Sequence, residues 1–99
     1  MSMNVSESCC AEILRALADQ TRLNVVRTLL LGPRRVSELN QQLQIDQSLL
    51  SHHLRVLREK NFVVAERDGK SVRYRLAAPL EHDRQGAVIN LGCCRIQFD

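Results

Sequence analysis

The sequence predicts a mostly α-helical domain with one small β-hairpin. Apolar residues recur at helical spacing over most of the chain up to residue 60, and two runs of alternating residues then flank Asp68-Gly69. Aromatic residues make up only 3% of the chain, so the core must be built from Leu, Val, Ile and Ala, which suits packed helices. A chain of 99 residues has room for one core, and we expect a single domain over residues 1–99.

Two helices are expected before the first proline-containing turn. The first should run from about residue 9 to residue 17 or 18, with Ser8 as its N-cap. The second should span residues 20–31, with Asp19 as its N-cap, and Gly32-Pro33 should end it. Arg34 and Arg35 then fall in a connection.

A short helix and a longer helix follow in close succession. Ser37 is the expected N-cap of the short helix, ELNQQLQ, and residues 45–46 form a brief turn into QSLLSHHLRVLREK, residues 47–60. Leu50, Leu54 and Leu57, with Val56 less squarely, should point into the core. This order is that of a helix-turn-helix, here over about residues 36–60, whose second helix reads DNA.

The opposite face of the longer helix is polar. Short donors and acceptors lie at its N-terminal end and positive charge lies further along, which is the arrangement needed to reach base edges and then phosphates in a major groove. The residues of this face are Gln47, Ser48, Ser51, His52 and Arg55. The neighbouring His53 is a packing or surface residue in this interpretation. An ordinary solvated surface helix is the alternative.

A basic hairpin is predicted directly after this helix, over about residues 62–76. FVVAER and SVRYRL are typical of two strands, and Asp68-Gly69 between them is a strong turn signal. Val72, Tyr74 and Leu76 should pack, whereas Ser71, Arg73 and Arg75 alternate with them on a cationic face. Such a hairpin is the wing of a winged helix-turn-helix, although an edge hairpin guarded by charge is the alternative.

Positive charge is concentrated in this part of the chain. Residues 47–76 hold seven basic and three acidic residues, a surplus of four, whereas the whole chain has a net charge of +3 and a pI of about 8.9. We expect Arg67, Lys70 and Arg73 to contact DNA phosphates or a minor groove from the wing. A winged helix used only for protein contact is disfavoured, because a protein interface would favour aromatic residues there.

Residues 77–99 are the least regular segment. Pro79 should break the last strand of the hairpin, and Gly86 and Gly92 are poor residues for a helix interior. A helix over about residues 80–90 is compatible with the pattern, and LGCCRIQF, residues 91–98, alternates enough to be a short strand or an extended tail.

The four cysteines form two vicinal pairs, Cys9-Cys10 and Cys93-Cys94. Each pair can offer two thiolates to one soft ion, so two pairs brought together by folding or dimerisation could bind arsenite, cadmium, lead or zinc. Alternatively, the cysteines are small buried residues. A third interpretation is a redox or persulfide switch, which would require exposed thiols of low pKa.

No targeting or catalytic signature was found. The N-terminus lacks a basic start followed by an apolar stretch, and no run approaches the roughly 18 apolar residues of a membrane span. We therefore expect a cytoplasmic protein with reduced cysteines and no membrane partner. An enzyme is not expected, because there is no nucleophile-base-orienter set and no phosphate-binding Gly loop.

Three segments together resemble the ArsR/SmtB family of bacterial winged-helix transcriptional repressors. They are LADQTRL, VSELNQQLQIDQSLLSHHLRVLREKNFV and VRYRLA, and the resemblance covers about residues 14–77. It implies a homodimer, formed through the first and last helices, on an imperfect palindrome in operator DNA. It also implies repression that is relieved by an inducer, often a metal or metalloid ion, and no cofactor for DNA binding itself. The positions that match the base-reading residues of the family are Gln47, Ser48, Ser51 and His52.

The chain departs from the family pattern in three places. Gln20 stands where the family has proline at a helix start. The helix before the reader helix lacks the family's Cys-x-Cys, since residues 38–42 contain no sulfur. Glu81-His82-Asp83 supplies one cluster for the family's zinc or cobalt site, but no second His follows. Neither metal site can be carried over, so the two cysteine pairs are the predicted ligands and arsenite is the leading inducer.

Overall fold

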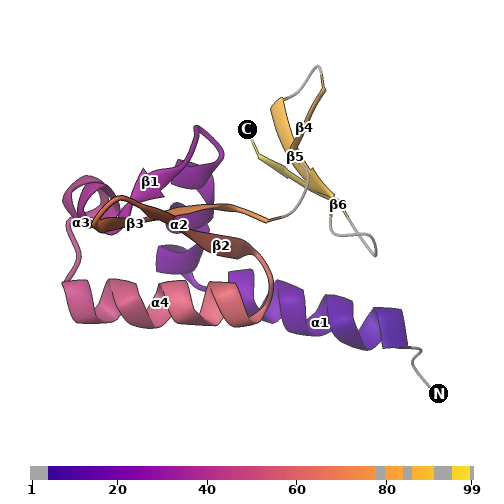
Figure 1. Cartoon of the computed structure of the whole chain (residues 1–99). Coiled ribbons are helices and arrows are strands. Elements are labelled where there is room, and N and C mark those ends of the chain that lie inside the picture. Colours follow the sequence, from indigo (N-terminus) through magenta and orange to yellow (C-terminus); the bar gives the residue numbers. More distant parts are fainter. Residues whose placement is uncertain (1–4, 78–79, 84–85, 91–94, 99) are drawn as a thin grey trace.

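The computed structural model describes residues 5–77, 80–83, 86–90 and 95–98, with side chains described for 11–77, 88–90 and 95–97. Four helices and two small antiparallel sheets make up these parts, with strand orders β1-β3-β2 and β4-β5-β6 (Figure 1). The elements are α1 Val5–Leu17, α2 Gln20–Leu29, β1 Arg34–Arg35, α3 Val36–Leu43, α4 Gln47–Glu59, β2 Val63–Asp68, β3 Ser71–Leu76, β4 Leu80–Asp83, β5 Gly86–Asn90 and β6 Arg95–Phe98.

The first two helices lie close to their predicted positions. α1 begins at Val5, so Ser8 lies inside the helix and is not its N-cap; residues 5–8 contain neither Pro nor Gly to prevent the extension. Asp19 is the N-cap of α2, as predicted, and accepts a hydrogen bond from the Arg22 N–H at 3.0 Å. α2 ends two residues early, at Leu29, ahead of a turn in which Gly32 has a φ of +140°.

The start of α3 differs from the sequence prediction. Its N-cap is Arg35, whereas Ser37 lies within the helix. Residues 34–35 are not a plain connection but the strand β1, which pairs with β3 and holds the backbone extended up to Arg35. The guanidinium group has no acceptor, so Glu38 stabilises this helix end by accepting a hydrogen bond from the Arg35 N–H at 2.9 Å.

The helix α4 has the two faces expected of it. Asp46 caps its start, because its carboxylate accepts from the N–H groups of Ser48 and Leu49 at 3.0 and 3.3 Å. Asn61, with a φ of +64°, follows its C-terminal end. The predicted core residues Leu50, Leu54 and Leu57 are buried, and Val56 packs partly against them.

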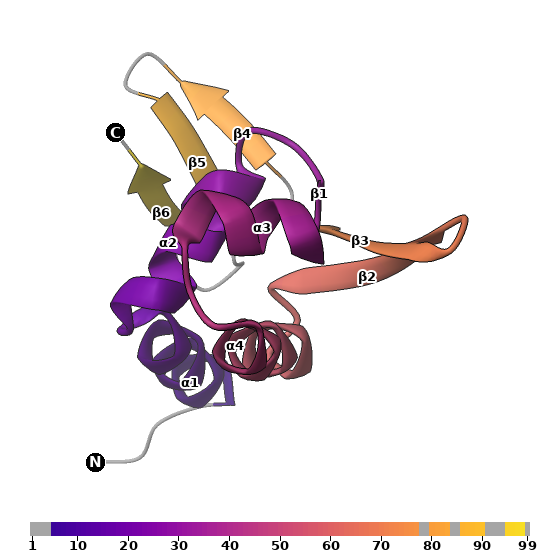
Figure 2. The same cartoon turned by 90° about the vertical axis from the view of Figure 1, so that its left-hand side faces the viewer.

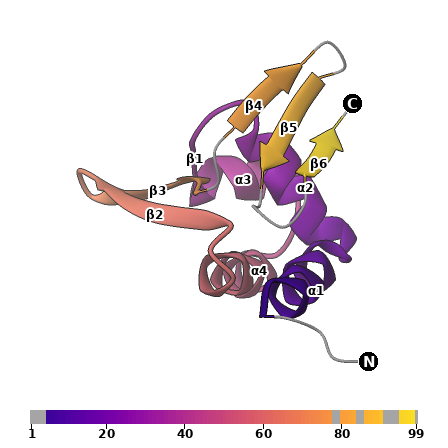
Figure 3. The same cartoon turned by 90° about the vertical axis from the view of Figure 1, so that its right-hand side faces the viewer.

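The predicted hairpin is present as β2 and β3, and its outer end extends away from the helices (Figures 2 and 3). Gly69 has a φ of +64° at the first central position of the turn, where a type II′ hairpin requires glycine. Tyr74 and Leu76 pack partly against the core as predicted. Val72 is 41% exposed, which corrects its predicted packing, because it lies next to the turn at the outer end of β3 and not against the core.

The C-terminal segment is a sheet where the sequence also allowed a helix. Residues 80–83 and 86–90 form the antiparallel pair β4–β5, so the helix over 80–90 is wrong. Gly86 disfavours a helix, and the β-branched Val88 and Ile89 favour a strand. β6 pairs with β5 and lies within the segment for which a short strand was considered. Residues 91–94 lie outside the described residues.

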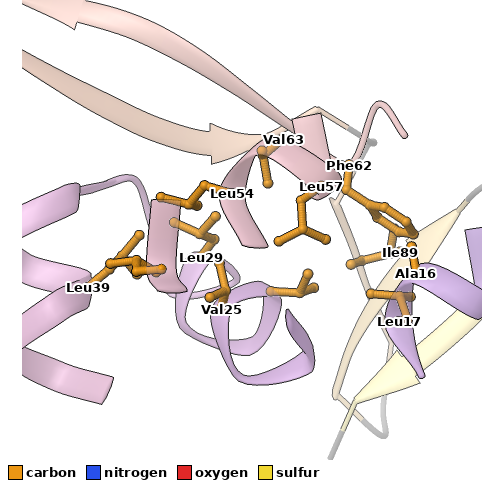
Figure 4. Close-up of a cluster of buried hydrophobic side chains, with 12 residues drawn as sticks. Ala16, Leu17, Val25, Leu29, Leu39, Leu54, Leu57, Phe62, Val63 and Ile89 are labelled. Atoms are coloured by element: carbon orange, nitrogen blue, oxygen red, sulfur yellow. The ribbon is translucent and has the colours of Figure 1, made fainter. Parts of the chain in front are cut away.

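One apolar cluster connects the helices with both sheets (Figure 4). Ile89 of β5 lies beside Ala16, Leu17 and Phe62 in this cluster, and each of the four is at most 8% exposed. The C-terminal sheet is thereby joined to the same core that orients α4. Within the described ranges, no helix combines the length and apolar character required to cross a bilayer.

A polar network connects α1, α2 and α4 beside this core. Arg22 donates from Nε to the Ala16 carbonyl oxygen at 2.5 Å and from Nη1 to His53 Nδ1 at 3.1 Å. A guanidinium group only donates, so His53 Nδ1 must accept, which places the imidazole proton on Nε2 and leaves the ring neutral. Burial lowers the pKa of His53, Arg22 and His52 act in the same direction, and Asp19 opposes them.

The free energy of unfolding should therefore depend on pH through His53. Because its pKa is lower in the folded protein, the unfolded chain takes up the proton first as the pH falls below about 6.5, and stability is lost down to the folded pKa. His53→Gln, whose amide oxygen can accept from Arg22, should remove this part of the fall in melting temperature between pH 8 and 5. The exposed His52→Gln is the matched control and should retain it. An unchanged pH profile in His53→Gln would contradict the assignment.

Candidate nucleic-acid interface

All five residues predicted for the polar face of α4 are exposed. They are Gln47, Ser48, Ser51, His52 and Arg55. Their position follows from the burial of Leu50, Leu54 and Leu57, because residues three and four apart share one side of a helix. His53, next to His52, is buried at 6% exposure and bonded to Arg22, which confirms that it packs.

A hollow of about 330 Å³ lies between α4 and the wing, and residues of β1, α3, α4 and β3 line it. It is lined by Arg35, Val36, Ser37, Gln47, Ser51, Ser71 and Val72. Of the predicted residues it brings together Gln47 and Ser51, while the others lie outside its lining. Ser37 and Ser71 also line the hollow, although no local pattern identified them as site residues. Ser71 belongs to β3, which lies far from α3 in the sequence and pairs with β1 at the start of α3.

The predicted wing residues Arg67, Lys70 and Arg73 are exposed, but they differ in their partners. Arg73 Nη2 lies 2.7 Å from Asp68 Oδ2. Among the described residues, no ion pair involves Arg67 or Lys70, so their charges are available to an incoming anion. Arg75 is paired with Glu66 on the neighbouring strand.

Asp68 also receives a second guanidinium, from the helix-turn-helix. Arg35 Nη2 lies 2.9 Å from the same Oδ2 atom that Arg73 contacts. The hydrogen bond from Arg35, together with the charge of Arg73, lowers the pKa of Asp68, and the carboxylate in turn raises the pKa of Arg35. Three charged groups from β1, β2 and β3 therefore form one ionic cluster.

This arrangement suits a nucleic acid better than a small molecule. Hydroxyl, amide and imidazole groups on the exposed face of a helix can hydrogen-bond to base edges, and guanidinium and ammonium groups on an adjoining hairpin can contact phosphates. The hollow between the two elements is open to solvent, so it does not resemble the enclosed cavity of a cofactor site.

The predicted metal ligands are only partly within the described residues. Cys9 and Cys10 lie in α1, but their side chains are not among those described, and Cys93 and Cys94 lie outside the described residues. The cluster of residues 81–83 lies on β4. Among the side chains that the structure describes, no group of three or more His, Cys, Asp or Glu could hold a metal ion. The thiolate site stays a prediction.

Comparison with known proteins gives a consistent set of relatives. Residues 19–64, from the N-cap of α2 to the start of β2, match the family described as bacterial regulatory protein, arsR family. The biofilm growth-associated repressor of Xylella fastidiosa strain 9a5c is 36% identical over 85 residues, which are 86% of this chain and 75% of the relative. A probable mercury resistance operon repressor of Streptomyces lividans is 41% identical over 69 residues, 70% of this chain and 55% of the relative.

Solved structures agree with this assignment. HlyU from Vibrio cholerae N16961 aligns with a TM-score of 0.73 at 32% identity, covering 77% of this chain and 83% of HlyU. Reduced HlyU from the same source aligns with a TM-score of 0.70, also at 32% identity, over 73% of this chain and 76% of that one.

The chain spans about half the length of two further relatives from Mycobacterium tuberculosis, 55% of NmtR and 49% of SmtB. The similarity to the Xylella repressor, however, extends over three quarters of that relative's length, at 36% identity. The winged helix-turn-helix arrangement is likewise shared with the solved regulator HlyU. This chain belongs to the ArsR family of bacterial regulatory proteins, which are DNA-binding regulators and not enzymes.

Proposed function

We propose that this chain is a sequence-specific repressor of transcription that binds operator DNA as a homodimer. The observation that carries the proposal is the exposed polar face of α4, which adjoins the wing across the hollow lined by Gln47, Ser51 and Ser71. Several relatives are named as repressors, which supports the direction of the regulation.

In this proposal two groups of residues have different tasks. Gln47, Ser48, Ser51 and His52 read base edges in the major groove, while Arg55, Arg67, Lys70 and Arg73 contact phosphates. Specificity resides in the first group, because phosphate contacts position a protein on DNA without distinguishing sequences.

Removal of a base-reading side chain should weaken operator binding and relax base preference. We expect Ser51→Ala or His52→Ala to cost about 1–3 kcal/mol of binding free energy, measured by titration of the protein's own promoter fragment. Gln20→Ala, which removes an exposed amide on α2 outside the hollow, is the control and should bind normally. Normal operator binding by a Gln47/Ser51/His52 triple-alanine protein would refute the groove assignment.

Removal of a wing cation should act uniformly on all sequences. Lys70→Ala should weaken specific and non-specific DNA binding alike and reduce the slope of log K against log salt by about 1. Lys60→Ala is a matched control, because Lys60 follows the opposite end of α4 from the hollow and its ammonium lies 3.6 Å from Glu12. An equal loss of slope in both variants would show that only total charge matters.

The proposed inducer is a thiophilic ion, with arsenite as the leading candidate and cadmium, lead or zinc as alternatives. The vicinal cysteine pairs supply suitable ligands, and one relative is named for mercury resistance. Cys9 and Cys10 lie in α1. This helix contacts α4 and its C-cap in two ways: Glu12 forms an ion pair with Lys60, and Arg22 bonds both to the Ala16 carbonyl oxygen and to His53. Ion binding at α1 would therefore act close to α4.

A redox or persulfide switch at the same cysteines is the second candidate. It draws support from the structural likeness to HlyU, which has also been solved in a reduced form. Two adjacent thiols are suited to either chemistry, since the thiolate is both the metal ligand and the group that is oxidised.

Release of DNA by separate additions distinguishes the two candidates. Arsenite, cadmium, lead, zinc, mercuric ion and an oxidant should be added one at a time to the protein–promoter complex in a gel-shift assay. We expect a thiophilic ion to release the DNA from the wild-type protein, and Cys9→Ser/Cys10→Ser or Cys93→Ser/Cys94→Ser to abolish that release without loss of binding. Release by the oxidant alone would refute the proposal that a thiophilic ion is the inducer and would favour the redox switch. Release that survives both double substitutions would exclude the cysteines as the sensor.

A further inference from the structure

One carboxylate oxygen connects all three strands of the wing sheet. Arg35 on β1 and Arg73 on β3 are direct register partners, and both guanidinium groups reach Asp68 Oδ2 on β2, at 2.9 and 2.7 Å. The strand order is β1-β3-β2, so Arg35 reaches past the central strand to the far one. The outer strand of the wing is thus bonded to the residue that begins the helix-turn-helix.

Arg35 is itself firmly placed. Its backbone N–H donates to Glu38 Oε1 at 2.9 Å, which ties it to the first turn of α3. The part of the wing near Asp68 has much less support, because it extends beyond the helices (Figure 2) and a Cβ atom built at Gly69 would meet nothing within 4 Å. The ionic cluster therefore connects a fixed point to a weakly packed one.

The sign of the charge at Asp68 is unexpected for an element that approaches DNA. A carboxylate on the wing is repelled by phosphates, so simple electrostatics predicts that its removal strengthens binding. Its geometry indicates the opposite role. Asp68 holds two guanidinium groups at one oxygen, and Arg35 also lines the hollow between α4 and the wing. A phosphate that approaches this oxygen would therefore meet two guanidinium groups side by side.

We propose that Asp68 is a positioning residue that fixes the wing against the helix-turn-helix and holds Arg35 and Arg73 together as a phosphate-binding pair, so that this acidic side chain strengthens specific DNA binding. The inference rests on the proposed function and adds Arg35 to the residues that contact DNA. Arg35 was not identified from the sequence, because it reaches Asp68 only through the sheet.

Glu66 provides a matched control. It lies on the same strand as Asp68, and its carboxylate pairs with Arg75 on β3, entirely within the hairpin. Asp68→Asn and Glu66→Gln each remove one negative charge from β2, but only Asp68→Asn removes the ion pair between β2 and Arg35, so that β1 holds the hairpin through its backbone pairing with β3 alone. Comparison of the two variants therefore separates the effect of wing positioning on DNA binding from the effect of total charge.

The experiment compares wild-type protein, Asp68→Asn and Glu66→Gln on the protein's own promoter fragment and on an unrelated duplex. Asp68→Asn should bind the promoter about three- to tenfold more weakly, since exposed ion pairs are individually weak and two are lost. Its binding to the unrelated duplex should be unchanged or tighter, so the specificity ratio falls. Glu66→Gln should bind both duplexes as well as wild type or better, and Asp68→Glu should recover part of the lost specificity. Promoter binding by Asp68→Asn that equals or exceeds that of Glu66→Gln would overturn the proposal.

A second measurement needs no DNA. Limited trypsin digestion should cleave after Lys70 faster in Asp68→Asn than in wild type or Glu66→Gln, because the outer end of the hairpin has lost its ion pair with Arg35. Equal cleavage rates in the three proteins would overturn the positioning role. If wild-type protein did not bind its promoter, the proposed function would fail, whereas the digestion would still decide whether Asp68 holds the wing.

Discussion

The burial of one leucine-bearing side of α4 is the constraint on which the rest of the site depends. Leu50, Leu54 and Leu57 are at most 1% exposed, and burial of a leucine side chain contributes about 1.5–3 kcal/mol. A rotation of the helix about its axis would expose these side chains, so the core fixes its orientation. The polar face, with Gln47 and Ser51, is outside for this reason and needs no separate interaction to hold it there.

The wing is attached by two different kinds of interaction along its length. Near the helices, Val63 is buried and Tyr74 and Leu76 pack partly against the core. Further out, Asp68 connects to Arg35 and Arg73 by exposed ion pairs. The core does not extend to the outer part of the hairpin, so charge takes the place of apolar packing there. The same guanidinium groups that hold the wing are also the groups that a phosphate can engage.

Local patterns in the sequence predicted much of the fold and the exposed polar face of α4. The helical period of α4, the Asp19 cap and the Asp68-Gly69 turn each depend on residues a few positions apart, which sequence reasoning can assess. The pairing of β1 with β3 depends on residues about 40 positions apart, so β1, the start of α3 at Arg35 and the contribution of Ser71 to the hollow were missed.

The C-terminal segment was ambiguous because short apolar runs with glycines fit more than one period. The cysteine pairs flank or lie within segments whose side chains are not described, so the sequence remains the basis for that hypothesis.

The most direct test of the central claim is to map the DNA-contacting residues of the whole chain by backbone amide NMR during titration with its own promoter duplex. The account predicts that the amides of residues 47–55 and 67–73, together with Arg35, shift or broaden, while those of the outer face of α2 remain unchanged. Perturbations confined to α1 or to the β4–β6 sheet, with residues 47–55 unaffected, would contradict the assignment of α4 as the reader of DNA.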